Sequence, residues 1–169
     1  MGRDKRNEKQ AEHWTKMIRH TMETAAWRAL SPTAQALIVW LKLEWRGPQA
    51  NNNGRIRLSV RQAAERMGVG INTAARAFHE LQAKGFIVCT EGARLGVGGE
   101  AKSPAYEITE LAMPGSDGRP RKLFADWRSG HDFPVMKAAA NNPNGSRRKA
   151  KPHHQNGDSA VTNIVTFRK

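Results

Sequence analysis

Polar side chains recur on one face of a helix predicted between Ile71 and Lys84. Asn72, Arg76 and His79 are separated by four and three residues, which places them on the same side of an α-helix. Asparagine and arginine form paired hydrogen bonds with the edges of adenine and guanine in the major groove of DNA. The spacing therefore predicts a face that reads base pairs, although many surface helices carry such residues and bind nothing.

Two neighbouring residues extend this predicted face. Ala75 can contact the methyl group of thymine, and Thr73, at the border of the face, can contact a phosphate. The opposite side of the helix carries the apolar stripe expected to pack on the rest of the domain: Ala74, Ala77, Phe78 and Leu81. Gln82 is expected to be exposed.

A shorter helix is predicted immediately before this one. Ser59 and Gln62 form an S-x-x-Q capping box, and Gly68 ends the helix because glycine adopts the left-handed conformation without a Cβ clash. Ala64 is small enough to let two helices cross closely. The two helices and the glycine turn between them indicate a helix-turn-helix, whose second helix would lie in the major groove.

Two predicted strands, 86–90 and 105–109, follow the second helix. The glycine-rich loop between them carries basic residues, which is the pattern of a wing beside a helix-turn-helix. A third short strand is predicted at 54–58. Arg94 and Lys102 of this wing are expected to reach the DNA backbone or the neighbouring minor groove. Arg55, Arg57 and Arg61 are expected to add backbone contacts, and Ser59 is also expected to bind DNA.

These segments resemble the winged helix-turn-helix DNA-binding family, which includes bacterial regulators of the MarR/GntR type and replication-initiator-like proteins of plasmids and phages. The resemblance is carried by W-R-A-L-S-P at 27–32, N-N-G-R-I-R-L-S at 52–59, A-A-E-R-M-G at 63–68 and T-A-A-R-A-F-H-E-L-Q-A-K-G-F-I at 73–87. It implies an α+β, mainly helical fold with a small antiparallel β-wing. Gly70 departs from the pattern, because such helices often begin with a capping Ser or Thr.

Composition favours the same kind of partner. The 169 residues carry a formal net charge of +13, which favours a polyanion and nucleic acid in particular. Cys89 is the single cysteine, so no internal disulfide can form, and it is expected to be a small buried residue. No apolar stretch is long enough to cross a membrane. The chain is therefore expected to be soluble and cytoplasmic, associated with the nucleoid when bound to DNA.

The expected organisation has three parts. Residues 1–20 form a flexible arm of mixed charge, 21–128 the winged helix-turn-helix domain, and 129–169 a disordered basic tail. Arg147 to Lys151 make a basic cluster in this tail that could attach to phosphates, and a tail without contacts is the equal alternative.

Three further helices are expected within the domain. The first covers Thr21 to Leu30. The second begins at Ser31-Pro32, a capping serine followed by proline at the first helical position, and is apolar nearly all round, as a central helix would be. The third covers Arg119 to Arg128 and is expected to pack on the domain or on a second subunit.

No catalytic constellation is apparent. His153-His154 has no cysteine or acidic residue nearby to complete a metal site, and a small nuclease would need clustered carboxylates. We therefore expect no enzyme activity, no metal, no cofactor and no small-molecule site. The expected function is sequence-specific binding of double-stranded DNA, by a transcriptional regulator and possible homodimer. The alternatives are a replication-initiation or maintenance protein of a plasmid or phage, and a winged helix used only for protein contacts.

Overall fold

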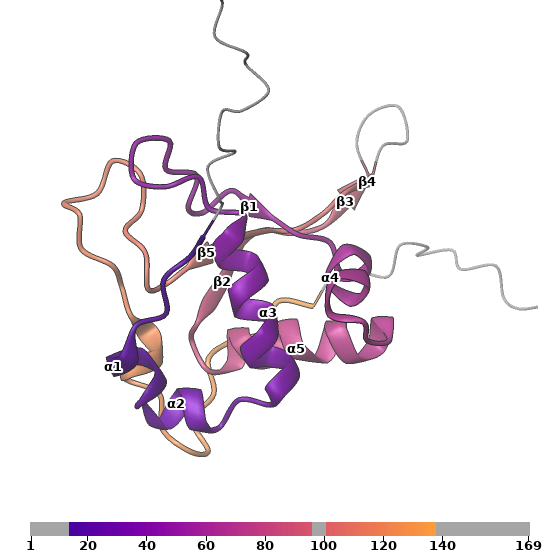
Figure 1. Ribbon diagram of the computed structural model, residues 1–169, viewed down its shortest axis with the longest axis horizontal. Coiled ribbons are helices and arrows are strands. Elements are labelled where there is room, and N and C mark those ends of the chain that lie inside the picture. Colours follow the sequence, from indigo (N-terminus) through magenta and orange to yellow (C-terminus); the bar gives the residue numbers. More distant parts are fainter. Residues whose placement is uncertain (1–13, 96–100, 138–169) are drawn as a thin grey trace, which may run out of the picture. The chain divides into compact units, whose positions relative to one another are not determined.

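The computed structural model describes residues 14–95 and 101–137 (Figure 1). This part of the chain has an α+β fold, in which five α-helices accompany a three-stranded antiparallel sheet. The helices are α1 (Arg19–Met22), α2 (Ala25–Arg28), α3 (Pro32–Leu43), α4 (Val60–Met67) and α5 (Ile71–Ala83). The strands are β1 (Ile56–Arg57), β2 (Ile87–Glu91), β3 (Arg94–Leu95), β4 (Ala101–Lys102) and β5 (Ala105–Ile108), and η2 (Leu123–Ala125) is a single 3-10 turn.

The predicted helix pair α4 and α5 and its turn are confirmed. The Ser59 side chain accepts from the Gln62 amide while the Gln62 side chain accepts from the Ser59 amide, so the capping box closes. Gly68 ends α4 at φ 66°, in the left-handed region. Ala64 is 4% exposed and faces the packed helices. The predicted apolar stripe of α5 is buried in full: Ala74, Ala77, Phe78 and Leu81.

Helix α3 packs against both α4 and α5, as expected for the central helix. Ser31 caps α3 by accepting from the Ala34 amide at 3.3 Å. The same serine is held by α5, because the Glu80 carboxylate accepts from its amide and from its hydroxyl, each at 2.6 Å. These bonds fix α5 to the beginning of α3, far apart in sequence but adjacent in the fold.

The sheet has the strand order β1-β5-β2, and the predicted third strand is confirmed as β1. Tyr106 at the centre of β5 pairs with Ile56 on one side and Cys89 on the other. The ring of Tyr106 stacks on Phe78 with 5.2 Å between centroids, which joins α5 to the sheet. The antiparallel strands β2 and β5 form a hairpin. Beyond the sheet this hairpin continues as the paired strands β3 and β4, with Arg94 opposite Lys102.

Two of the predicted helices are wrong in extent. The segment from Thr21 to Leu30 contains two short helices, because Thr24 is extended and its side chain caps α2 at the Trp27 amide. The segment 119–128 contains only the 3-10 turn η2. Lys122 at the start of that turn has φ 47°, which no α-helix tolerates, although Trp127 is buried as expected.

Residues 129–137 differ from the expected disordered tail because they pack on the domain. The Phe133 amide donates to the carbonyl of Ala83 at 2.8 Å. The Met136 amide donates to the side chain of Gln82 at 3.0 Å. Gln82 is therefore 3% exposed, and its expected exposure is wrong. Residues 138–169, with the basic cluster 147–151 and the two tail histidines, lie outside the described residues.

This packing predicts where the chain can be shortened. Ending the protein after Arg128 is expected to lower the free energy of unfolding by about 2–4 kcal/mol, because the contacts of Phe133 with the core are lost. Ending it after Lys137 is expected to change that free energy by less than about 0.5 kcal/mol. Urea unfolding of the full chain and both shortened chains measures the difference. Equal stability of the two shortened chains would contradict the packing of 129–137.

A buried ion pair joins α3 to the segment after β5, and the beginning of the described chain is hydrogen-bonded to both of its members. Lys42 of α3 pairs with Glu110, which follows β5, and their side chains are 6% and 4% exposed. The Thr21 hydroxyl also donates to Glu110, and the Lys42 ammonium donates to the carbonyl of Lys16 at 3.4 Å. Residues 14–20 thus contact the domain within the segment expected to be a flexible arm, whereas residues 1–13 lie outside the described residues.

Candidate nucleic-acid interface

The exposed face of α5 is divided into an open half and a covered half. Asn72 and Arg76 are exposed and make no side-chain hydrogen bond to any other described residue. Ala75 and His79 are half-buried and line a pocket that Met136 also lines. The open half is therefore accessible to solvent.

The beginning of α5 lies beside this open half. Gly70 is the N-cap and supplies no side-chain bond, as its sequence position predicts. The Ile71 and Asn72 amides have no partner among the described residues, whereas the Thr73 amide donates to the Gly70 carbonyl at 2.9 Å. A helix N-terminus of this kind favours an anion, because its amides and the helix dipole both carry positive partial charge. Thr73 lies in the same turn and is half-buried.

Helix α4 contributes one of its two predicted contacts to this surface. Arg61 is exposed and forms no ion pair with a described residue. Ser59, in contrast, is occupied by the capping box, since its hydroxyl both accepts from the Gln62 amide and donates to the Gln62 side chain. The structure therefore gives Ser59 a role in the fold.

The basic residues of the hairpin are organised by one carboxylate. Glu91 at the end of β2 pairs with Arg57 of β1 and, at 2.6 Å, with Arg94 of β3. Arg57 also donates to the carbonyl of Ser103, so its guanidinium holds β1 to the hairpin. Arg94 remains 62% exposed despite its pairing, and Lys102 across the ladder is exposed. Arg94 and Lys102 are thus the cations that the hairpin presents to solvent.

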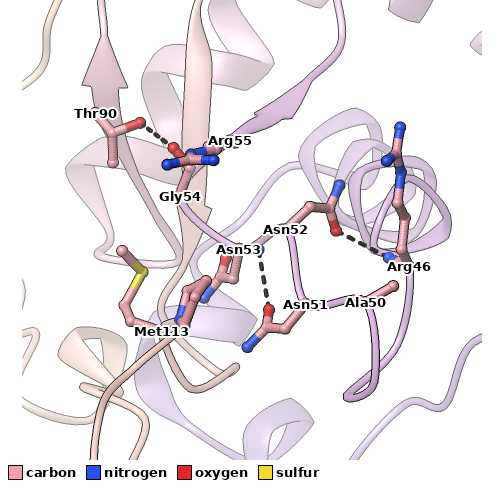
Figure 2. Close-up of a pocket in the computed structure, with 10 residues that line it drawn as sticks. Arg46, Ala50, Asn51, Asn52, Asn53, Gly54, Arg55, Thr90 and Met113 are labelled. Atoms are coloured by element: carbon pink, nitrogen blue, oxygen red, sulfur yellow. Dashed lines mark hydrogen bonds between the residues drawn. The ribbon is translucent and has the colours of Figure 1, made fainter.

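Arg55 is separated from the other predicted site residues. It lines a cavity of about 590 Å³ to which neither α4 nor α5 contributes a residue. Figure 2 shows this cavity between Arg46, the asparagine loop and Met113. The asparagines are used by the fold: Asn51 accepts from the Trp45 indole at 2.9 Å, and the fully buried Asn53 accepts from the Ile108 amide at 2.7 Å.

Sequence reasoning missed the approach of the C-terminal segment to α5. Lys137 lines the same pocket as Ala75 and His79, so the last described residue adds a cation beside the predicted reading face. Phe133 and Met136 are the apolar residues within a polar run that could have indicated such a docked segment. Their partners on α5 lie about fifty residues earlier, and no local pattern connects the two.

Cys89 lies in β2, as predicted, and is half-buried. Burial raises the pKa of its thiol above the ordinary value, and a hydrogen bond with the Glu91 backbone opposes this only in part. A thiol that stays protonated is a poor nucleophile. The structure therefore agrees with a packing role for Cys89 in the sheet.

Comparisons with protein-family models, with curated proteins and with solved structures returned no significant match to this chain. Within residues 14–95 and 101–137, no helix is long and apolar enough to cross a membrane. The same residues contain no group of three or more histidine, cysteine or acidic side chains placed to hold a metal ion.

Proposed function

We propose that this protein is a winged helix-turn-helix protein that binds double-stranded DNA in a sequence-specific manner. The observation that carries the proposal is the open half of α5, where Asn72 and Arg76 are exposed and unpaired beside the uncapped helix N-terminus. In this assignment α4 and α5 are the helix-turn-helix, α5 enters the major groove, and the hairpin from β2 to β5 is the wing.

The charges around α5 support a polyanionic partner. Arg61 lies on α4, Lys137 lies beside the covered half of α5, and Arg94 and Lys102 lie on the hairpin. In Figure 1 the β3–β4 ladder extends to the same side of the view as α4. Cations on both elements would follow the phosphates on either side of a groove occupied by α5, and they would carry most of the sequence-independent affinity.

In this proposal, the residues on the exposed face of α5 make two types of DNA contact, to base edges and to phosphates. Asn72 and Arg76 bind base edges, because asparagine and arginine make the bidentate contacts that distinguish adenine and guanine. Thr73 and the first-turn amides bind a phosphate. Ala75 and His79 are half-buried, so they would contact only those DNA groups that extend beyond the Arg76 side chain toward the domain. Within the group of predicted backbone contacts, Arg61, Arg94 and Lys102 remain in the proposal, while Arg57 and Ser59 support the fold.

Changing Arg76 to Ala is expected to weaken binding to the preferred sequence by about 1–3 kcal/mol and to relax the preference at one base position. Selection from a random double-stranded DNA library, with the full chain and with the variant, measures both effects. Arg119→Ala is the matched control, because it removes one exposed arginine from the loop that follows β5. An unchanged preference in Arg76→Ala would contradict the assignment of Arg76 as a base reader.

The biological role that fits this activity is transcriptional regulation. Sequencing of the DNA bound in cells tests it, since a regulator is expected at promoters. Binding confined to one iterated origin would instead assign the protein to plasmid or phage replication. If the selection enriched no sequence from the random library, the DNA-binding proposal itself would be overturned.

A further inference from the structure

A pocket of about 340 Å³ lies between α5, the hairpin and the C-terminal segment 129–137. Its walls are mainly apolar, and they include Phe78 of α5 and Met136 of the segment. The remaining lining residues used below are Ala75, His79, Cys89, Gly92, Tyr106 and Lys137. The volume falls in the range typical of small-molecule sites, which are apolar cavities with a few polar groups.

One polar group in this wall, the Tyr106 hydroxyl, has no hydrogen-bond partner among the described residues. Tyr106 is 4% exposed, and its hydroxyl forms no hydrogen bond with any described residue. Among those residues, no side-chain oxygen or nitrogen is both hidden from solvent and without a partner. Because Tyr106 lines the pocket, its hydroxyl is the group in this wall that we assign to pair with a bound molecule. By contrast, Gln82 in the same wall is used at both ends of its amide.

The surroundings of the hydroxyl indicate an uncharged ligand. Burial raises the pKa of Tyr106, with a smaller contribution from Cys89, so this wall disfavours negative charge. A cation is disfavoured as well, because Lys137 lines the pocket and no Asp or Glu among the described residues does. An uncharged hydroxyl or carbonyl group satisfies Tyr106 without either penalty.

We propose that this pocket binds a small, uncharged, largely apolar molecule through one hydrogen bond to the Tyr106 hydroxyl. A dry apolar cavity of about 150 Å³ is sufficient for benzene. The pocket beside Tyr106 therefore has room for a substituted or bicyclic ring. Phe78 and Met136 supply the apolar contacts, and the hydroxyl fixes the orientation of the ligand.

The same site is placed to regulate DNA binding, an inference that rests on the proposed function. Ala75 and His79 belong both to the pocket wall and to the covered half of the reading face. A molecule in the pocket would contact these two side chains, which the proposed function places at the edge of the DNA-binding face. We expect its affinity to differ between the free and the DNA-bound protein, which is the condition for coupling between two sites.

The probe for the site is 2-phenylethanol, compared with phenylacetate and 2-phenylethylamine, which have the same ring and a similar chain but carry a charge. Titration of the full chain is followed by NMR of the Met136 and Ala75 methyl groups. We expect saturable shifts with 2-phenylethanol and an affinity at least tenfold lower for both charged compounds. The proposal would be overturned if no methyl signal shifted up to the solubility limit of 2-phenylethanol, or if the three compounds bound with equal affinity.

Two variants locate the probe. Tyr106→Phe keeps the stacked ring and is expected to weaken 2-phenylethanol binding about fivefold, as the loss of one neutral hydrogen bond would. Gly92→Leu is expected to abolish it, because a Cβ at Gly92 would lie 3.7 Å from the Met136 sulfur, in ordinary contact, and so extends into the pocket. Ser129→Ala, which removes an exposed hydroxyl, should bind like the parent. Parental affinity in both pocket variants would place the probe elsewhere and overturn the site.

Coupling is measured separately, as the affinity for the selected DNA with and without saturating 2-phenylethanol. We expect at least a threefold change in the parent and none in Gly92→Leu. Probe binding without any change in DNA affinity would overturn the regulation and leave the site intact. Failure to bind DNA in the absence of probe would overturn the proposed function, whereas the NMR titration would still decide the site.

Discussion

Replacing Lys42 with Met is expected to lower the free energy of unfolding by about 3–5 kcal/mol, because the variant leaves the buried carboxylate of Glu110 without its cation. The side chain of Met fits the path of the lysine stem, so packing changes little. The cost comes from a charge that has lost its partner in a region closed to water. Thermal and urea unfolding of the full chain measure the change.

A second substitution identifies the cause. Lys42→Met combined with Glu110→Leu removes both charges, and it is expected to recover most of the lost stability, as paired apolar replacements of buried ion pairs do. Arg19→Ala is the control on the surface, because Arg19 and Glu23 form an ion pair with side chains 91% and 55% exposed. Such an exposed pair contributes about 0.5 kcal/mol or less. If Lys42→Met melted like Arg19→Ala, the pair would not be buried as described.

Gly85→Ala is expected to lower the free energy of unfolding by about 3–5 kcal/mol. Gly85 has φ 75°, which strains any residue with a Cβ by about 1–2 kcal/mol. The added carbon would also lie 2.8 Å from the Phe133 ring and 3.0 Å from the backbone of Leu123. Overpacking of this kind costs about 1–3 kcal/mol more. Urea unfolding of the full chain measures the sum.

The matched control is Gly68→Ala, which has a similar φ of 66° but no atom within 4 Å of the new Cβ. It is expected to cost about 1–2 kcal/mol, from backbone strain alone. The difference between the two alanine variants therefore measures the close contacts of the new Cβ with Phe133 and with the Leu123 backbone. Equal losses would show that the segment 129–137 does not lie against Gly85.

Locally encoded features of the fold were predictable from the sequence. The capping box at Ser59, the glycine stop at Gly68 and the cap before Pro32 each depend on residues within one turn of one another. The burial of the α5 stripe follows from periodicity in the same way. The division of Thr21 to Leu30 was also within reach, since Thr24 stands three residues before the amide that it caps.

Features that depend on distant partners were not predictable. Gln82 lies on the polar border of α5, and only its bonds to Met136 make it a buried residue. Lys42 lies on an otherwise apolar helix, and nothing near it in sequence indicates Glu110 as its partner. In the candidate site, too, some features follow from the local sequence and others depend on distant residues. The exposure of Asn72 and Arg76 follows from helix geometry, whereas the engagement of Arg57 by Glu91 requires the sheet register.

The attachment of Glu80 to Ser31 has a consequence for how this protein could acquire a new target. The carboxylate and the buried stripe hold α5 in position. Asn72 and Arg76 take no part in that attachment, so the fold does not constrain which residues stand at these two positions. A library randomised at 72 and 76 alone should therefore contain mostly folded proteins. If the proposed function is correct, its members would differ in the DNA sequence they bind while having similar thermal stability, because the attachment of α5 to the domain is unchanged.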